Sequence, residues 1–139
     1  DGPMKDQLHE QSKSLGLDEV VTFTGLQTDA PAWLSSFDVF MMTSDFEGLP
    51  LALLEAMSCA NVIVATEAGG IPEAATHEVH ALLSHPGDQN QLAINLVRIC
   101  KDPALRAQLS DSARKRVEGQ FSLTQMVHQL ENLYTVFYP

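Results

Sequence analysis

The residues from 39 to 57 constrain the fold of this chain most, because a strand signal, a turn and a helix signal follow one another without interruption. Residues 39–42 are continuously apolar, which predicts a buried strand. Gly48 and Pro50 then break the pattern, and residues 51–57 are strong helix formers. The order strand, turn, helix is typical of sheets whose strands run parallel.

Further strand signals alternate with helix signals along the chain. Short β-branched or apolar runs predict strands at residues 20–25, 38–43, 62–66 and 79–84. Helices are expected at 4–15, from Pro31, at 51–57 and at 72–75, and then from Asp88, Pro103 and Ser122 to the end. This alternation predicts an α/β fold, a three-layer α/β/α Rossmann-like domain with a mainly parallel sheet. About four strands are predicted, one fewer than such a sheet usually has.

The size and composition of the chain fit one domain. A chain of 139 residues with 45% apolar content has room for a single core, so residues 1–139 are expected to form one partial domain with a C-terminal helix at 120–139. No apolar run reaches the roughly 18 residues that a membrane span needs. Two cysteines, Cys59 and Cys100, are too few for a disulfide framework, which favours a cytoplasmic location.

Several local features carry specific expectations. Asn61 is expected to end the helix that contains Met57 in the left-handed conformation, and residues 110–112 are expected to break the helix from Pro103 in two. Met41, Met42 and Met57 are expected in the core. Cys59 has no nearby cation that would lower the pKa of its thiol, so an apolar filler is favoured over a nucleophile.

The distribution of charge bears on possible ligands. The net charge of −10 weighs against a nucleic-acid partner, because binding to a phosphate backbone is carried by Lys and Arg. No lysine or arginine occurs between Lys13 and Arg98. A phosphate bound at the centre of the chain would therefore rely on backbone N–H groups and a helix dipole, or on cations from another part of the protein.

Two glutamates in the central stretch admit two interpretations. Glu47 lies where ligands bind in open parallel sheets, and Glu55 stands in an apolar helix without a cation nearby. In the first interpretation both are ordinary solvated acids. In the second, Glu47 binds a polyhydroxylated group, Glu55 binds a neighbouring diol, and backbone N–H groups at the helix start face an anion.

A second glycine-bearing loop follows the strand at 62–66. Gly69 and Gly70 could simply form a turn that needs positive φ, or they could line the same crevice as the first loop, with backbone N–H groups close to a ligand. His77, His80 and His85 have no Cys or Asp partner at ligand spacing, so no metal site is expected.

The residues resemble a known family, the family 4 retaining glycosyltransferases, which have the GT-B fold. Glu47 and Glu55 stand in the sequence SDFEGLP followed by LEAM and are similar to the Glu-x7-Glu signature of that family. Residues 21–25 resemble its V-x-F-x-G strand, and residues 64–73 resemble its T-x-x-GG-x-PE loop. The short segments at 86–88, 102–103 and 121–122 also match, so the resemblance covers essentially the whole chain.

The resemblance implies the C-terminal, nucleotide-sugar-binding domain of such an enzyme. It implies that Glu47 lies by the donor sugar and is the catalytic residue, that Glu55 bonds the ribose hydroxyls, and that the amides after Glu47 approach the diphosphate. It implies no metal and no cofactor other than the nucleoside diphosphate sugar that serves as donor. The expected donor-binding residues are Glu47, Gly48, Leu49, Pro50, Leu51, Glu55, Gly69 and Gly70.

The departures from the family pattern imply that the chain is part of a larger protein. The first strands of the domain, with the Arg and Lys that grip the diphosphate in the family, would lie upstream of Asp1 and are expected to be missing, and an N-terminal acceptor-binding domain is also expected there. Peripheral membrane contact is expected only through that domain, and the chain alone is expected to be inactive and to bind nucleotide very weakly. Ala81 stands at a position where members of the family usually have Gly.

The sequence is also consistent with two other functions. One is a non-catalytic α/β interaction module that self-associates, because the last helix carries a wide apolar stripe. The other is a nucleotide-sugar epimerase of related fold.

Overall fold

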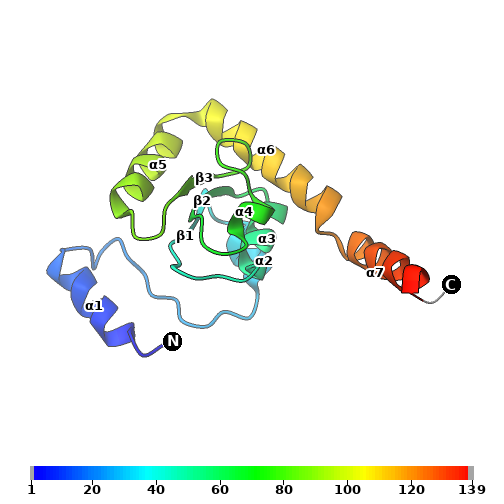
Figure 1. Ribbon diagram of the computed structural model, residues 1–139. Coiled ribbons are helices and arrows are strands. Elements are labelled where there is room, and N and C mark those ends of the chain that lie inside the picture. The colour runs from blue at the N-terminus through cyan, green and yellow to red at the C-terminus, as the bar shows by residue number, and fades with distance from the viewer. Residues whose placement is uncertain (1, 138–139) are drawn as a thin grey trace. The chain divides into compact units, whose positions relative to one another are not determined.

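A computed structural model describes residues 2–137, which divide into two compact units (Figure 1). The first unit ends at Ala30 and contains helix α1 (Lys5–Ser14). The second unit begins at Pro31 and contains all the strands found in the described part of the chain. A short helix, α2 (Ala30–Leu34), begins at the boundary.

Three parallel strands form the sheet of the second unit. Strand β2 (Val62–Thr66) lies between β1 (Val39–Met42) and β3 (Leu82–Ser84). Val39 pairs with Val62 and Val64 pairs with Leu82, so the carboxyl ends of the strands meet at one edge. All five residues of β2 are buried, which explains why the sequence of this strand is apolar without alternation.

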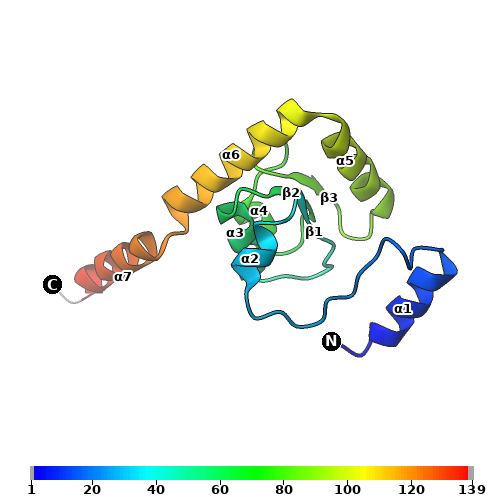
Figure 2. The ribbon, with the colours of Figure 1, turned by 180° about the vertical axis from the view of Figure 1, so that it is seen from behind.

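Helices cover both faces of this sheet, as the sequence predicts. On one face lie α3 (Leu51–Ser58) and α4 (Ile71–Ala74), and on the other lies α5 (Gln89–Lys101). The longest helix, α6 (Pro103–Gln120), runs from the α5 side to the α3 side in both views (Figures 1 and 2). Its Leu109 belongs to the core under α5, whereas its Ala113 and Val117 belong to the core under α3.

Three helix starts predicted from capping residues are confirmed. Asp88 caps α5 by accepting a hydrogen bond from the Gln91 N–H at 2.9 Å. Asp102 caps α6 by accepting one from the Leu105 N–H, also at 2.9 Å. Helix α7 (Leu123–Phe137) begins directly after Ser122.

The prediction of a strand at residues 20–25 is wrong. These residues have no regular secondary structure, and Val20 is 76% exposed. A strand is stable only when another strand pairs with it, and no described residue pairs with this segment. The predicted strand at 79–84 is shorter than expected, because residues 78–80 form a turn and only Leu82–Ser84 pairs with β2.

Two predictions about helix ends are also wrong. The residue after α3 with positive φ is Ala60, at 59°, whereas Asn61 is buried. The Asn61 amide donates hydrogen bonds to the carbonyl oxygens of Leu34 and Phe37 at 2.8 and 2.9 Å, which holds the end of α2 against the start of β2. Helix α6 is continuous, so residues 110–112 do not interrupt it.

Among the three methionines expected in the core, Met57 is fully buried and Met42 packs against the core, but Met41 is 41% exposed. Met41 belongs to an edge strand, whose residues have a neighbouring strand on one side only.

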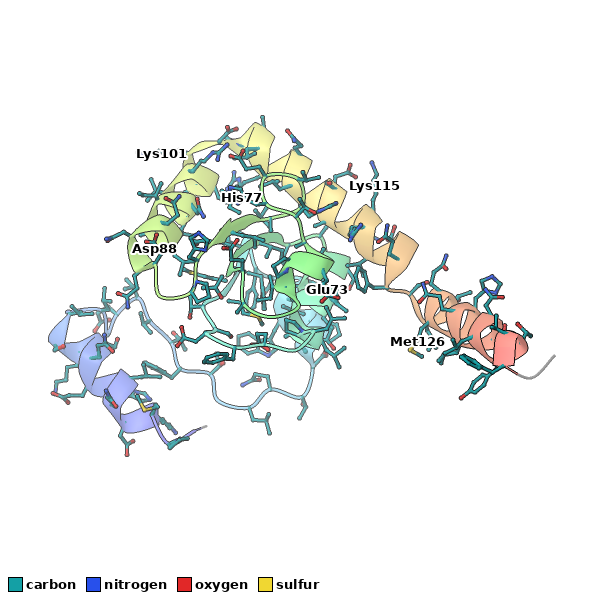
Figure 3. The ribbon with its side chains drawn as sticks, viewed as in Figure 1. Glu73, His77, Asp88, Lys101, Lys115 and Met126 are labelled. Atoms are coloured by element: carbon teal, nitrogen blue, oxygen red, sulfur yellow. The ribbon has the colours of Figure 1, made fainter. Side chains whose placement is uncertain are left out.

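Helix α7 buries none of its residues. Its apolar side chains are exposed from Leu123 to Phe137, and Figure 3 labels Met126 among them. Residues 138–139 of the predicted C-terminal helix lie outside the described part of the chain. No helix of the described residues is both long and apolar enough to cross a membrane.

Candidate functional site

Two loops meet at the carboxyl edge of the sheet. The first, residues 43–50, connects β1 to α3, and the second, residues 67–70, follows β2. The Gly70 N–H donates a hydrogen bond to the carbonyl oxygen of Gly48 at 2.8 Å, so the loops are in direct contact. The sequence predicts that both loops line one crevice, and the structure brings the two loops into contact.

The contact between these loops requires glycine at two positions. Gly69 has φ of +53°, and a Cβ at this residue would lie 1.7 Å from the carbonyl oxygen of Glu47. A Cβ at Gly70 would lie 2.3 Å from the carbonyl oxygen of Gly48. Because the Gly70 N–H is used by Gly48, it is not free to face a ligand as the sequence suggested. These glycines allow two backbones to approach.

The side chain of Glu47 is half-buried and held in place. The Ser44 hydroxyl donates a hydrogen bond to Glu47 Oε1 at 2.7 Å. The Thr66 hydroxyl, at the end of β2, donates in turn to the carbonyl oxygen of Ser44 at 2.6 Å. Thr66 is 1% exposed, so this anchor is protected from water. Sequence reasoning did not find these supports. Ser44 belongs to the same loop as Glu47, but Thr66, which holds Ser44, comes from β2, 22 positions further along the chain.

The start of α3 has free hydrogen-bond donors. Pro50 precedes the helix with φ of −71° and ψ of 116°, and no side chain caps it. The N–H groups of Leu51 and Ala52 have no hydrogen-bond partner among the described residues, and the first turn contains no acid. A helix start of this kind favours an anion through its dipole and its N–H groups.

Glu55 lies on the exposed side of α3. Leu53, Ala56 and Met57 on the same helix are buried, so α3 packs on the sheet with its other side. The carboxylate of Glu55 has no hydrogen-bond partner among the described residues and is accessible. Glu55 therefore faces solvent although its neighbours in the sequence are apolar. The hydrogen bonds from a diol to its carboxylate stay a prediction.

The histidines that follow α4 serve the local backbone. His77 Nδ1 accepts a hydrogen bond from the Leu83 N–H at 2.9 Å, and His80 Nδ1 accepts one from the Thr76 N–H at 3.1 Å. Burial, together with the nearby Arg116 guanidinium, lowers the pKa of His80 below its ordinary value. Within residues 2–137, no group of three or more His, Cys, Asp or Glu side chains could hold a metal ion.

The arrangement combines a supported carboxylate with free backbone donors. Glu47 can accept hydrogen bonds from hydroxyl groups, and the first turn of α3 can donate to an anion beside it. A ligand that carries hydroxyls and a phosphate close together fits both requirements. No cation of the described second unit belongs to these two loops, since its first basic residue is Arg98.

Comparison with known proteins gives a family match. Residues 1–116 match the model of the family described as glycosyl transferases group 1. The chain is 32% identical over 134 residues to N-acetyl-alpha-D-glucosaminyl L-malate synthase of Bacillus anthracis. This match covers 96% of the chain and 35% of the synthase, so the chain spans about a third of the length of that relative.

Solved structures show the same fold. Sucrose-phosphate synthase from Thermosynechococcus elongatus matches with a TM-score of 0.90 and 28% identity, over 99% of this chain and 35% of that one. Anabaena Alr3699/HepE in complex with UDP-glucose matches with a TM-score of 0.88 and 28% identity, over 94% of this chain and 36% of that one. The mixed α/β fold with a parallel sheet that the sequence predicts is thus confirmed.

Proposed function

This chain belongs to the glycosyl transferases group 1 family, and on that premise we propose that it is the donor-binding part of a retaining glycosyltransferase. The observation that carries the proposal is the uncapped start of α3 beside the supported Glu47 carboxylate. The donor is a nucleoside diphosphate sugar. Support comes from Anabaena Alr3699/HepE, which shares the fold and has been solved with UDP-glucose.

In the proposed reaction, a sugar moves from the nucleoside diphosphate to an acceptor hydroxyl. The bond between the anomeric carbon and the diphosphate oxygen breaks, and a bond from the same carbon to the acceptor oxygen forms with retained configuration. The acceptor hydroxyl loses its proton, and the nucleoside diphosphate leaves with the bonding electrons. The proposed reaction uses no protein nucleophile and no metal ion.

Each of the expected donor-binding residues has a proposed role. Glu47 accepts hydrogen bonds from hydroxyls of the donor sugar and holds its anomeric carbon in place for transfer. The free N–H group of Leu51 and the N–H groups of Gly48 and Leu49 just before α3 donate to the diphosphate, and Pro50 fixes the turn between them. Glu55 accepts hydrogen bonds from the two ribose hydroxyls. Gly69 and Gly70 form the second wall by allowing the close approach of the loops.

The rest of the proposed enzyme supplies what these loops do not. An exposed helix terminus contributes about 0.3 to 1 kcal/mol toward an anion, which is small against the charge of a diphosphate. We propose that basic residues and an acceptor-binding domain outside this chain complete the site. The relative from Bacillus anthracis is about three times as long as the matched region, which leaves room for such a domain.

Substitution of the two glutamates tests the proposal in the complete protein that carries this chain. Nucleotide release and sugar transfer would be measured with UDP-sugars and GDP-sugars. We expect Glu47→Gln to abolish transfer and Glu55→Gln to raise the KM for the donor. Glu131→Gln, on the exposed surface of α7, is the matched control and should retain full activity. Full transfer by Glu47→Gln would contradict the proposed role.

A further inference from the structure

A polar pocket lies beyond the end of β3, apart from the Glu47 loop. Its volume is about 460 Å³, and we call it the β3-end pocket. Figure 3 labels two of its residues, His77 before β3 and Asp88 at the start of α5. The polar side chains that line it are Glu67, His77, Ser84, His85, Asp88 and Gln91.

The hydroxyl of Ser84 is the unusual group in this pocket. Ser84 is 5% exposed, and its Oγ has no hydrogen-bond partner among the residues that the structure describes. Side chains alternate along a strand, so Ser84 lies on the same face as Leu82, which packs in the core under α5. Ser84 therefore faces the first turn of α5, where Asp88 and Gln91 line the pocket. Buried hydroxyls are normally hydrogen-bonded, so a ligand at this position would satisfy Ser84.

The other groups of the pocket define the chemistry of that ligand. Glu67 Oε1 contacts His85 Nδ1, and Asp88 uses only Oδ1 to cap α5. No lysine or arginine lines the pocket, and two carboxylates do, so a phosphate or another anion is disfavoured. Because His77 Nδ1 accepts a hydrogen bond from the Leu83 N–H, the neutral ring carries its proton on Nε2 and can donate. Carboxylate acceptors, a hydroxyl and an N–H donor suit a neutral molecule with several hydroxyl groups.

The pocket adjoins the proposed donor site through the backbone. The Glu67 N–H donates to the carbonyl oxygen of Ser84 at 2.9 Å, which joins the ends of β2 and β3. Two residues after Glu67, Gly69 contacts the backbone of Glu47. The β3-end pocket and the Glu47 loop therefore lie along the same carboxyl edge of the sheet.

We infer that the β3-end pocket is a second hydroxyl-binding subsite, which takes a neutral carbohydrate through Ser84, Glu67 and Asp88. The choice of a carbohydrate among polyhydroxylated molecules rests on the proposed function. The evidence from the pocket and from the unpartnered Ser84 hydroxyl is independent of that function.

Nuclear magnetic resonance of the 139-residue chain tests this subsite directly. D-glucose is the probe, and inorganic phosphate is the comparison. We expect glucose to shift the amide signals of Glu67, Ser84 and His85 with millimolar affinity, and phosphate to leave them unchanged. Absence of glucose shifts, or shifts of these amides with phosphate, would overturn the inference. This measurement needs no nucleotide, so it stands even if the chain proves to bind no donor.

Ser84→Ala separates a binding role from a structural one. The substitution removes a buried hydroxyl without a partner, so the variant should be as stable as the native chain or more stable in urea. We expect its glucose affinity to fall about three- to tenfold, the effect of one lost hydrogen bond. Ser36→Ala, which removes an exposed hydroxyl bonded to the Trp33 carbonyl, is the matched control and should bind glucose normally. Equal affinity in Ser84→Ala would overturn the inference.

Kinetics of the complete protein identify the source of the carbohydrate. If the subsite holds the acceptor, Ser84→Ala raises the KM for the acceptor and leaves hydrolysis of the nucleotide sugar without acceptor unchanged. If it holds the donor sugar, the variant raises the KM for the donor and lowers that hydrolysis. Unchanged kinetics for both substrates would overturn the subsite. Loss of all nucleotide-sugar turnover in the unsubstituted protein would instead contradict the proposed function.

Discussion

Gly70 donates its N–H to the carbonyl oxygen of Gly48 across 2.8 Å, and this bond joins the loop after β2 to the loop that carries Glu47. The position of Glu47 thus depends on residues from a neighbouring strand.

Gly69→Ala is expected to destabilise the chain and to disturb the donor loop. Its Cβ would lie 1.7 Å from the carbonyl oxygen of Glu47, and its φ of +53° is strained for alanine. We expect the free energy of unfolding in urea to fall by about 2 kcal/mol or more. Gly119→Ala is the matched control, because nothing lies within 4 Å of its Cβ and it belongs to α6. That control should gain about 0.5 to 1 kcal/mol, so equal effects of the two substitutions would argue against the loop contact.

Thr66→Val is expected to weaken the support of Glu47. The variant loses the hydrogen bond to the carbonyl oxygen of Ser44 but keeps its shape. We expect kcat/KM of the complete protein to fall about tenfold, equivalent to about 1.4 kcal/mol, with a smaller change in stability. Thr66→Ser retains the hydroxyl and should retain most of the activity. A larger loss in Thr66→Ser than in Thr66→Val would show that the methyl group matters and the hydrogen bond does not.

The stability of the chain is expected to fall as the pH drops below about 6.5. Burial and then Arg116 lower the pKa of His80, so the unfolded chain binds this proton more readily than the folded one. The neutral form is present in both states above the ordinary pKa, and the penalty grows as the pH falls from there toward the folded pKa. Urea denaturation across this range measures the slope. His80→Gln should reduce it, whereas an unchanged slope would assign it to other groups.

Weak nucleotide binding is expected for the 139-residue chain. Between Lys13 and Arg98 the chain has no lysine or arginine to balance a diphosphate. Titration calorimetry with UDP and with GDP should show affinity weaker than micromolar, and added salt should weaken it further. Micromolar affinity would show that backbone N–H groups alone are sufficient to bind the diphosphate. It would contradict the proposal that basic residues outside this chain are needed.

The central part of the fold was predictable because its signals are local. The apolar run of β1, the turn at Gly48 and Pro50, and the helix formers of α3 each specify their own conformation, and the structure has them in that order. Asp88 and Asp102 likewise cap the helices that follow them. Residues 20–25 have the composition of a strand, but a strand also needs a pairing partner, and composition does not provide one.

The supports of the candidate site could not be predicted, because they depend on contacts between distant residues. Thr66 reaches Ser44, and Asn61 reaches Leu34 and Phe37, across 22 to 27 positions of sequence. Glu47 and Glu55 were found as candidates through their spacing and the family resemblance. Their assignment to a donor sugar and a ribose stays a prediction, as does self-association through the exposed face of α7.

The close contact between the two loops has a consequence for engineering. Residues 43–50 and 67–70 fit each other backbone to backbone, and neither glycine of the second loop leaves space for a side chain. Chimeras that exchange one loop for that of another transferase would therefore join two surfaces that have not been matched. Donor specificity should be transferable between such proteins only when both segments are exchanged as a pair.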